Sequence, residues 1–310
     1  MVVNESVLAK KVQVKVLTPR IGAVLSGVDL TRELTHEDLH DIEAAVLAHR
    51  VVFFRAQHLD AAAQLAFARR LGAVTRAHPT LPASSEDPAV FDLDSQAGSA
   101  ANHWHTDVTF VERPPTLSVL SALTIPEIGG DTLWANTVAG YADLRPGIRA
   151  LADELRAVHT NGQDYGRVDV ARARGRVRPE QLKHLERFVS TIYETEHPVV
   201  RIHAETGERA LLLGGFAQRL VGHSLPESVD ILRTLQAYVT RPENTVRWHW
   251  KEGDVAVWDN RATQHYAIYD YGTRHRHVRR VTTAGAVPIG LDGRPSLALQ
   301  GDDRHYHFED

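Results

Sequence analysis

The sequence predicts a mixed α+β protein whose core is a β-sandwich or jelly roll wrapped by helices. Many short β-rich stretches, separated by turns, follow one another from about residue 104. Helical patterns are scattered among them without regular βαβ alternation, which is typical of this fold class. The 310 residues contain 43% hydrophobic residues and show no repeat of fixed period and no linker. We therefore expect a single domain over residues 1–310.

Strand and helix patterns alternate in the first hundred residues. Three stretches have strand patterns: residues 12–16, 22–30 and 51–54. The helical spacing of residues 38–48 follows Thr35, and Asp38 completes a variant of the capping box at the third helical position. Asp60 is expected to cap a second helix, which ends at Gly72.

The rest of the chain is predicted to be rich in strands. The candidates are residues 116–124, 131–136, 198–203, 209–213, 245–250, 255–259 and 278–284. Helical patterns interrupt them at residues 137–145, 147–157 and 226–239. The arginine-rich residues 161–186 fit either an exposed loop and helix or a lid over an active site. The polar tail, residues 301–310, is expected to fray and to leave His305 and His307 in solvent.

The charge and residue counts exclude several classes of protein. A net charge of −4 gives no reason to expect a nucleic-acid partner or an anionic membrane partner. We expect a cytoplasmic protein, because no stretch reaches 18 uninterrupted apolar residues and the amino terminus lacks a secretory signal. The absence of cysteine excludes thiolate ligands. Any transition metal must therefore be bound by nitrogen and oxygen atoms, and the chain has 18 histidines.

One His-x-Asp motif stands out as a candidate metal site. The motif occurs three times, at His36–Asp38, His58–Asp60 and His105–Asp107. The first lies at the start of a predicted helix, where positions i and i+2 diverge, and Asp60 is explained as a helix cap. His105 and Asp107 lie in a segment rich in β-formers, NHWHTDVTF. On a strand they point to the same face, so they can bind one ion together.

His265, which follows the strand-like run VAVWD, is the candidate for a third ligand. Two histidines and one carboxylate form the facial triad of non-haem iron(II) oxygenases. Zinc accepts the same residues, and His265 taken alone is equally well explained as a polar residue at a strand end.

Arginines crowd the last predicted strand. If the strand begins at residue 276, so that residues 276–284 are extended, Arg276 and Arg280 share one face and would point inward, about 13 Å apart along the strand. Because a buried charge requires a partner, two inward guanidinium groups imply anionic ligands or protein carboxylates. Arg274 and Arg279 fit a solvated edge.

The motifs WHTDVTF, GGDTLWAN, WDNRATQHYA and R-x-x-x-R occur in an order and at a spacing that resemble the taurine/2-oxoglutarate dioxygenase family, from Val12 to Gly285. The resemblance implies a double-stranded β-helix, which is a cupin-like jelly roll, together with Fe(II), 2-oxoglutarate as cosubstrate and O2. It implies that the iron ligands are His105, Asp107 and His265. It also implies that Thr132 and Arg276 anchor the far carboxylate of 2-oxoglutarate.

The resemblance also implies a pocket for a small anionic substrate. Arg280 matches the arginine that meets the substrate sulfonate, helped by His78 and the backbone of Val108, and Phe216 matches an aromatic wall. Leu81 replaces a tyrosine that encloses the amine end of taurine. The asparagine used for that end is also replaced, by Ala101, unless a shift of one residue supplies Asn102. With these departures, the chain resembles the alkylsulfatase branch of the family more closely than the taurine dioxygenases.

The expected activity is hydroxylation of the carbon next to the sulfur-bearing group of an alkyl sulfate ester or alkyl sulfonate. The products would be an aldehyde and sulfate or sulfite, with succinate and CO2. One alternative is a biosynthetic oxygenase of the same superfamily that hydroxylates or desaturates a carboxylate-bearing amino acid or natural product. Another is a non-catalytic cupin-like metal-binding protein, which would leave Thr132 and Arg276 without purpose. The family resemblance implies a homodimer or homotetramer.

Overall fold

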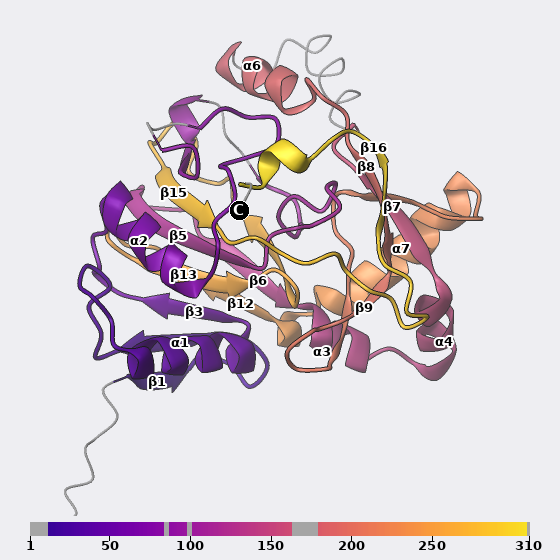
Figure 1. The fold of residues 1–310 in the computed structure, drawn as a ribbon, viewed down its shortest axis with the longest axis horizontal. Helices are drawn as coiled ribbons and strands as arrows, with labels where there is room; N and C mark the ends of the chain where they lie inside the picture. The colour runs from indigo at the N-terminus through magenta and orange to yellow at the C-terminus, as the bar shows by residue number, and fades with distance from the viewer. Residues whose placement is uncertain (1–11, 84–86, 98–100, 163–178, 309–310) are drawn as a thin grey trace, which may run out of the picture.

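The structure, a computed structural model, describes residues 12–83, 87–97, 101–162 and 179–308. A seven-stranded sheet in the order β1-β2-β3-β13-β5-β15-β4 faces a three-stranded sheet in the order β12-β6-β14 (Figure 1). The large sheet contains β1 (Gln13–Val16), β2 (Ala23–Ser26), β3 (Val51–Phe54), β4 (Phe91–Asp94), β5 (Leu117–Thr124), β13 (Val255–Asp259) and β15 (His277–Thr282). The small sheet contains β6 (Thr132–Asn136), β12 (Thr245–Trp248) and β14 (Thr263–Ala267).

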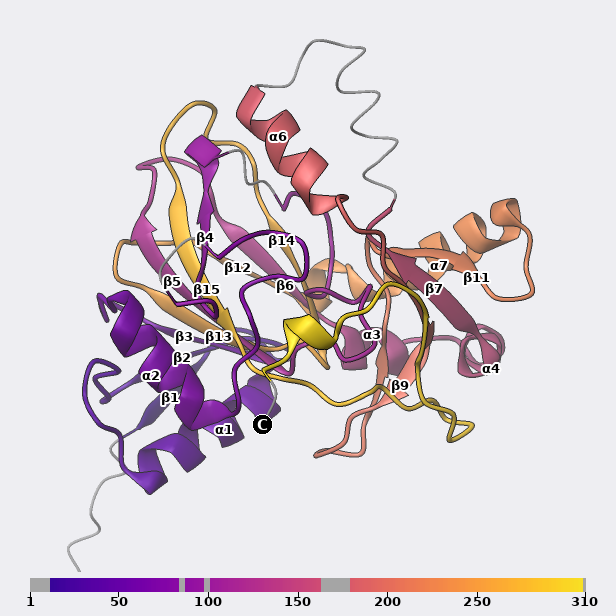
Figure 2. The same cartoon turned by 45° about the horizontal axis from the view of Figure 1, so that its top comes forward.

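Two further sheets and six helices complete the described elements longer than a single 3-10 turn. A four-stranded sheet contains β7 (Arg156–Thr160), β8 (Glu194–Pro198), β11 (Ala217–Leu220) and β16 (Leu297–Gln300), and a two-stranded sheet contains β9 (Val200–Ile202) and β10 (Arg209–Leu211). The helices are α1 (His36–His49), α2 (Ala61–Leu71), α3 (Thr137–Ala142), α4 (Pro146–Glu154), α6 (Pro179–Phe188) and α7 (Leu225–Val239). In Figure 2, α1 and α2 lie on one side of the molecule, and α3, α4 and α7 lie on the other. Facing sheets flanked by helices confirm the predicted α+β class.

The large sheet has a hydrophobic core on each of its two faces, and the strands between the cores are continuously apolar. Alternate residues of a strand point to opposite faces, so a strand that is buried on both faces must be apolar at every position. In β3, Phe53 packs toward the small sheet, whereas Phe54 packs against α1 and α2. The same division in β13 sends Trp258 inward and Val257 toward the helices.

An aromatic cluster fills the space between the two sheets. Phe53 stacks on Trp248 with ring centroids 4.1 Å apart, and Trp134 meets Trp258 edge-on at 5.6 Å. Large aromatic side chains dominate the burial energy of such a core, at roughly 2–3 kcal/mol each. Trp258 also contacts His265 at 4.9 Å between ring centroids, so this rigid cluster backs one wall of the cavity described below.

The predicted helix caps are confirmed. The Thr35 side chain accepts a hydrogen bond from the backbone N–H of Asp38, whose carboxylate accepts one in return from the N–H of Thr35. Asp60 accepts from the N–H of Ala63 at 2.7 Å and so begins α2. Each cap satisfies a backbone donor that the helix itself leaves free, and contributes about 1 kcal/mol.

The carboxyl-terminal segment differs from the expected frayed tail as far as residue 308. Tyr306 is fully buried and belongs to a cluster with Phe110 and Phe216. The burial of that ring holds the segment on the protein, so that His307 is buried while His305 is exposed, as predicted. Most of the possible lid, residues 161–186, lies outside the described residues, and the single-domain organisation stays a prediction. No described helix has the length and apolar character needed to cross a membrane.

Candidate active site

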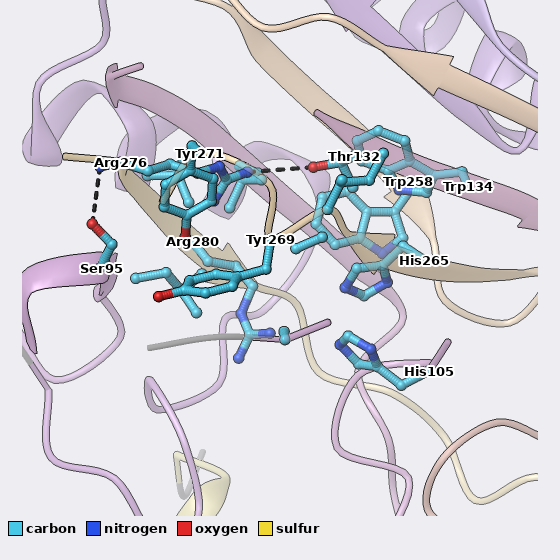
Figure 3. A pocket seen from close by; sticks show the side chains of 16 residues that line it. Ser95, His105, Thr132, Trp134, Trp258, His265, Tyr269, Tyr271, Arg276 and Arg280 are labelled. Atoms are coloured by element: carbon cyan, nitrogen blue, oxygen red, sulfur yellow. Dashed lines mark hydrogen bonds between the residues drawn. The ribbon is translucent and has the colours of Figure 1, made fainter. Parts of the chain in front are cut away.

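Three predicted ligands come together in the interior. Nε2 of His105 lies 4.0 Å from Oδ1 of Asp107, and Nε2 of His265 lies 3.8 Å from the same oxygen. All three side chains are buried, and one ligand atom from each lies within 4.8 Å of the other two. The two imidazole rings lie next to one another in Figure 3, with centroids 4.1 Å apart. We refer to His105, Asp107 and His265 as the triad.

A bridge and a turn, instead of the expected strand, position the first two triad residues. His105 forms an isolated antiparallel bridge with His265, each N–H donating to the other's carbonyl. Residues 107–110 then form a turn, in which Val108 has a φ of +53°. A β-branched residue in this region is strained, so surrounding contacts must fix the turn.

Two buried histidines hold that turn from behind. Nε2 of His197 donates to the carbonyl of Thr109 at 2.8 Å, and Nδ1 of His159 lies 2.9 Å from the Thr109 hydroxyl. Both histidines are fully buried, and burial is the main cause that lowers their pKa values. Neutral imidazoles can make these hydrogen bonds without the cost of a buried charge. His159 and His197 therefore stabilise the strained turn that carries Asp107.

The electrostatics of the triad fit a divalent transition-metal ion. Burial lowers the pKa of His105 to about 3 and that of His265 to about 4, so both imidazoles are neutral and keep a lone pair. Burial opposes ionisation of Asp107, but the charge of Arg280, together with the hydrogen bond from Ser118, outweighs it and brings that pKa to about 2. Nδ1 of His105 bonds the carbonyl of His103 at 2.8 Å, which leaves Nε2 to face the triad. Two neutral nitrogen donors and one carboxylate suit Fe(II) or Zn(II).

A hydrogen-bonded chain orients the triad carboxylate. Oδ2 of Asp107 accepts from the Ser118 hydroxyl at 2.7 Å, and Ser118 accepts from Nδ2 of Asn260 at 2.8 Å. The indole N–H of Trp258 in turn donates to Oδ1 of Asn260 at 3.0 Å. Sequence reasoning missed Ser118 and Asn260 as functional residues. The adjacent Trp-Asp-Asn run of a recognised motif was the available signal for Asn260.

The substitution Ser118→Ala is expected to weaken metal binding by about 10- to 100-fold, because the hydrogen bond from Ser118 holds the Asp107 carboxylate in the orientation that binds the ion. The measurement is a titration of the metal-free protein with Fe(II) under anaerobic conditions. Ser121→Ala is a matched control, since Ser121 lies on the same strand and its buried hydroxyl makes no hydrogen bond within the described part of the chain. Equal affinities for the two variants would show that Ser118 does not orient Asp107.

A cavity extends from the triad histidines to Thr132 and Arg276, the residues predicted to anchor 2-oxoglutarate. Nη2 of Arg276 donates to the Thr132 hydroxyl at 3.3 Å (Figure 3). Its Nε donates to the carbonyl of Gly130 at 2.9 Å. The backbone N–H of Arg276 donates to the Ser95 hydroxyl, and the indole N–H of Trp250 donates to Thr132. Arg276 is thus held rigidly at the cavity wall, with a hydroxyl beside its guanidinium group. Sequence reasoning missed Ser95 and Trp250 as positioning residues.

A second cavity adjoins the first and is lined mainly by apolar side chains. The five predicted substrate residues all line it: His78, Leu81, Val108, Phe216 and Arg280. His105 and Arg280 also line the first cavity. Ala101 lines both cavities, whereas Asn102 is exposed and lines neither. The two cavities therefore meet beside the triad, one with Arg276 and the other with Leu81 and Phe216.

His78 presents a neutral hydrogen-bond donor to this second cavity. Its Nδ1 accepts from the backbone N–H groups of Thr80 at 3.1 Å and Leu81 at 3.2 Å. The imidazole proton must therefore lie on Nε2. Burial, and then the nearby Arg280 and His184, keep the pKa of His78 well below its usual value.

Arg280 already has a protein partner. Its Nη1 donates to Oδ1 of Asp107, the oxygen that faces both triad histidines, and its guanidinium lies 5.5 Å from the centroid of the Phe91 ring. Arg279, on the opposite face of β15, pairs with Asp92 instead, as the alternation of the strand predicts. A cation at the triad would replace Arg280 as the partner of Asp107, and an anion would replace Asp107 as the partner of Arg280.

Comparisons with known proteins agree with this arrangement. The chain matches the family model "Taurine catabolism dioxygenase TauD, TfdA family" over residues 13–282. It is 52% identical to an alkylsulfatase of Acinetobacter baylyi, covering 92% of this chain and 88% of that protein. It is 50% identical to an alpha-ketoglutarate-dependent sulfate ester dioxygenase of Pseudomonas putida, covering 93% and 94%. A solved taurine dioxygenase from Burkholderia xenovorans superposes with a TM-score of 0.79 at 40% identity, covering 94% and 96% of the two chains.

Proposed function

Because the chain belongs to the TauD, TfdA family of taurine catabolism dioxygenases, we propose that it is an Fe(II)- and 2-oxoglutarate-dependent dioxygenase acting on an alkyl sulfate ester or alkyl sulfonate. It hydroxylates the carbon next to the sulfur-bearing group and so releases an aldehyde with sulfate or sulfite, together with succinate and CO2. Family membership also confirms the predicted jelly-roll fold.

The triad would hold Fe(II), and Arg276 and Thr132 would hold the far carboxylate of 2-oxoglutarate. Iron, when bound, supplies the activation of O2 that accompanies oxidative decarboxylation of 2-oxoglutarate. The protein supplies placement: Arg276 is buried and tied to Gly130 and Thr132, so its donors are fixed before the cosubstrate arrives. The aromatic cluster behind His265 excludes water from that side of the site.

The single observation that carries the substrate class is the lining of the second cavity. A guanidinium from Arg280 and a neutral donor from His78 lie in a cavity with walls of Leu81, Phe188 and Phe216. Such a cavity binds an oxyanion that carries an alkyl chain. The ammonium group of taurine would be desolvated beside Leu81, which itself packs against Phe91 and Ala77.

A substrate screen tests this proposal. Succinate formation should rise strongly with hexyl sulfate, less with hexanesulfonate, and weakly with taurine or hexanoate. The aldehyde and sulfate should appear in amounts equal to succinate. A preference for the carboxylate would move the protein to the biosynthetic alternative, and no substrate-dependent succinate with any compound would contradict the proposed activity.

The substitution Arg280→Met is expected to raise the KM for the alkyl sulfate by about 30- to 100-fold, because a charge-assisted hydrogen bond to a buried anion is worth about 2–3 kcal/mol. The KM for 2-oxoglutarate should change less than threefold. Arg279→Met is the control, since Arg279 is the next residue along β15 but faces Asp92. A larger effect of the control than of Arg280→Met would contradict the assignment.

The small-molecule substrate agrees with family membership. The homodimer or homotetramer and the cytoplasmic location expected from the sequence stay predictions.

A further inference from the structure

A second group of metal-ligating side chains lies on the outer face of the β4–β15 edge of the large sheet. We propose that Asp94, His275 and His277 bind a second divalent transition-metal ion, for which Zn²⁺ is the probe. Two imidazoles and one carboxylate favour a metal ion of intermediate hardness, such as Zn²⁺. This proposal does not depend on the proposed function.

Strand pairing brings the three ligands together. Antiparallel pairing of β15 with β4 places His277 directly opposite Asp94. His275 precedes it by two positions, and their rings lie 6.0 Å apart between centroids, inclined by 21°. Nε2 of His275 already lies 3.0 Å from Oδ1 of Asp94. One ligand atom from each side chain lies within 4.8 Å of the other two.

The cluster needs only small rotations to close on an ion. Zinc bonds of about 2.0–2.1 Å require ligand atoms about 3.4 Å apart. The three side chains are between one fifth and one third exposed, so an ion can reach them from solvent and they have room to rotate. The triad in the interior has the same donor set and satisfies the same distance limit.

The hydrogen bonding of His277 is incomplete. Its Nε2 makes no hydrogen bond of good geometry within the described residues, because its contact with Oδ1 of Asp92 is long, at 3.4 Å. Asp92 is engaged by Arg279, whose Nε donates to the same oxygen at 2.8 Å. An ion would take the lone pair of His277 and leave Asp92 with Arg279. Asp92 and Asp94 carry two negative charges and Arg279 carries one positive charge, so the surroundings of the site have a net negative charge that favours a cation.

The proposed site is separate from the triad but adjoins the cosubstrate cavity through the backbone. Arg276 lies between the two histidines in sequence and points to the opposite face, where it lines that cavity. Ser95 follows Asp94, and its hydroxyl accepts the backbone N–H of Arg276. An ion that ties β4 to β15 at Asp94 would therefore also stiffen the position of Arg276.

The test counts zinc ions bound to the metal-free full-length protein by equilibrium dialysis and metal analysis. We expect two ions per wild-type chain and one in the variant His105→Ala/Asp107→Ala, which removes two triad ligands. We also expect one in His275→Asn/His277→Asn and none when the two pairs are combined. With Co²⁺ as the probe, each double variant should lack the visible absorption band of the ion whose ligands it has lost. Asp94→Asn, which retains both imidazoles, should weaken the second ion at least 10-fold.

A control variant, His36→Asn/His40→Asn, removes two exposed histidines one turn apart on α1. It should keep both ions. Loss of the second ion in this variant, or its retention in His275→Asn/His277→Asn, would overturn the proposal. Thermal unfolding of each variant shows whether it is folded, and a misfolded double variant leaves Asp94→Asn to decide: unchanged affinity there also overturns the proposal.

Discussion

Asp107→Ala is expected to abolish succinate formation, with a loss of at least about 1000-fold, because the change removes the only anionic ligand of the triad. Fe(II) content after anaerobic loading should fall with activity. The metal-free protein should also lose about 3 kcal/mol in its free energy of unfolding, since Arg280 is left buried without its carboxylate partner. Substrate-dependent succinate assays and urea unfolding measure the two effects separately.

Asp60→Ala is the matched control for this substitution. Asp60 lies in the same His-x-Asp pattern, but its carboxylate caps α2. The control should lose about 1 kcal/mol of stability and keep its iron and its activity. If Asp107→Ala formed succinate at a rate comparable to that of Asp60→Ala, the triad assignment would be wrong.

Arg276→Met is expected to raise the KM for 2-oxoglutarate by about 100-fold. The guanidinium is buried, and its replacement removes the proposed charge-assisted hydrogen bond to the far carboxylate of 2-oxoglutarate, worth about 3 kcal/mol. Methionine keeps an apolar stem of similar length. The KM for the alkyl sulfate should stay within about threefold, which distinguishes this effect from that of Arg280→Met. Steady-state assays that vary one compound while the other is saturating give both constants.

The control for this change is Arg274→Met. Arg274 is exposed and precedes the strand by three residues, so its loss removes the same charge without altering the cavity. Its KM for 2-oxoglutarate should match that of the wild type. A shift of similar size in both variants would indicate a general electrostatic effect in place of direct binding by Arg276.

Periodicity predicted the arginine-bearing strand well. The alternation of residues 276–280 placed Arg276 and Arg280 inside and Arg279 outside, and the structure agrees although the register of β15 with β5 shifts between His277 and Val278. The shift falls in the pairing with β5, whereas the pairing with β4 stays regular. The three arginine side chains therefore keep the inward and outward directions that the alternation predicts.

The turn at residues 107–110 was beyond local prediction. NHWHTDVTF has the composition of a strand, but His159 and His197 hold Thr109 from distant parts of the chain. Tertiary contacts of this kind override local propensity. The ion pair of Arg280 with Asp107 was equally inaccessible, because no pattern in the sequence relates a strand residue to a turn 173 positions away.

Arg280 and a metal ion would compete for the same oxygen of Asp107, so the binding of the metal ion and the binding of the anionic substrate are thermodynamically coupled. While Arg280 bonds that oxygen, the metal-free site is an internally neutralised pair, with little attraction for a free anion. A cation at the triad releases the guanidinium, so the two ligands bind with positive cooperativity, and each must raise the affinity for the other by the same factor. An anion affinity measured on the metal-free protein will therefore understate the affinity of the loaded protein.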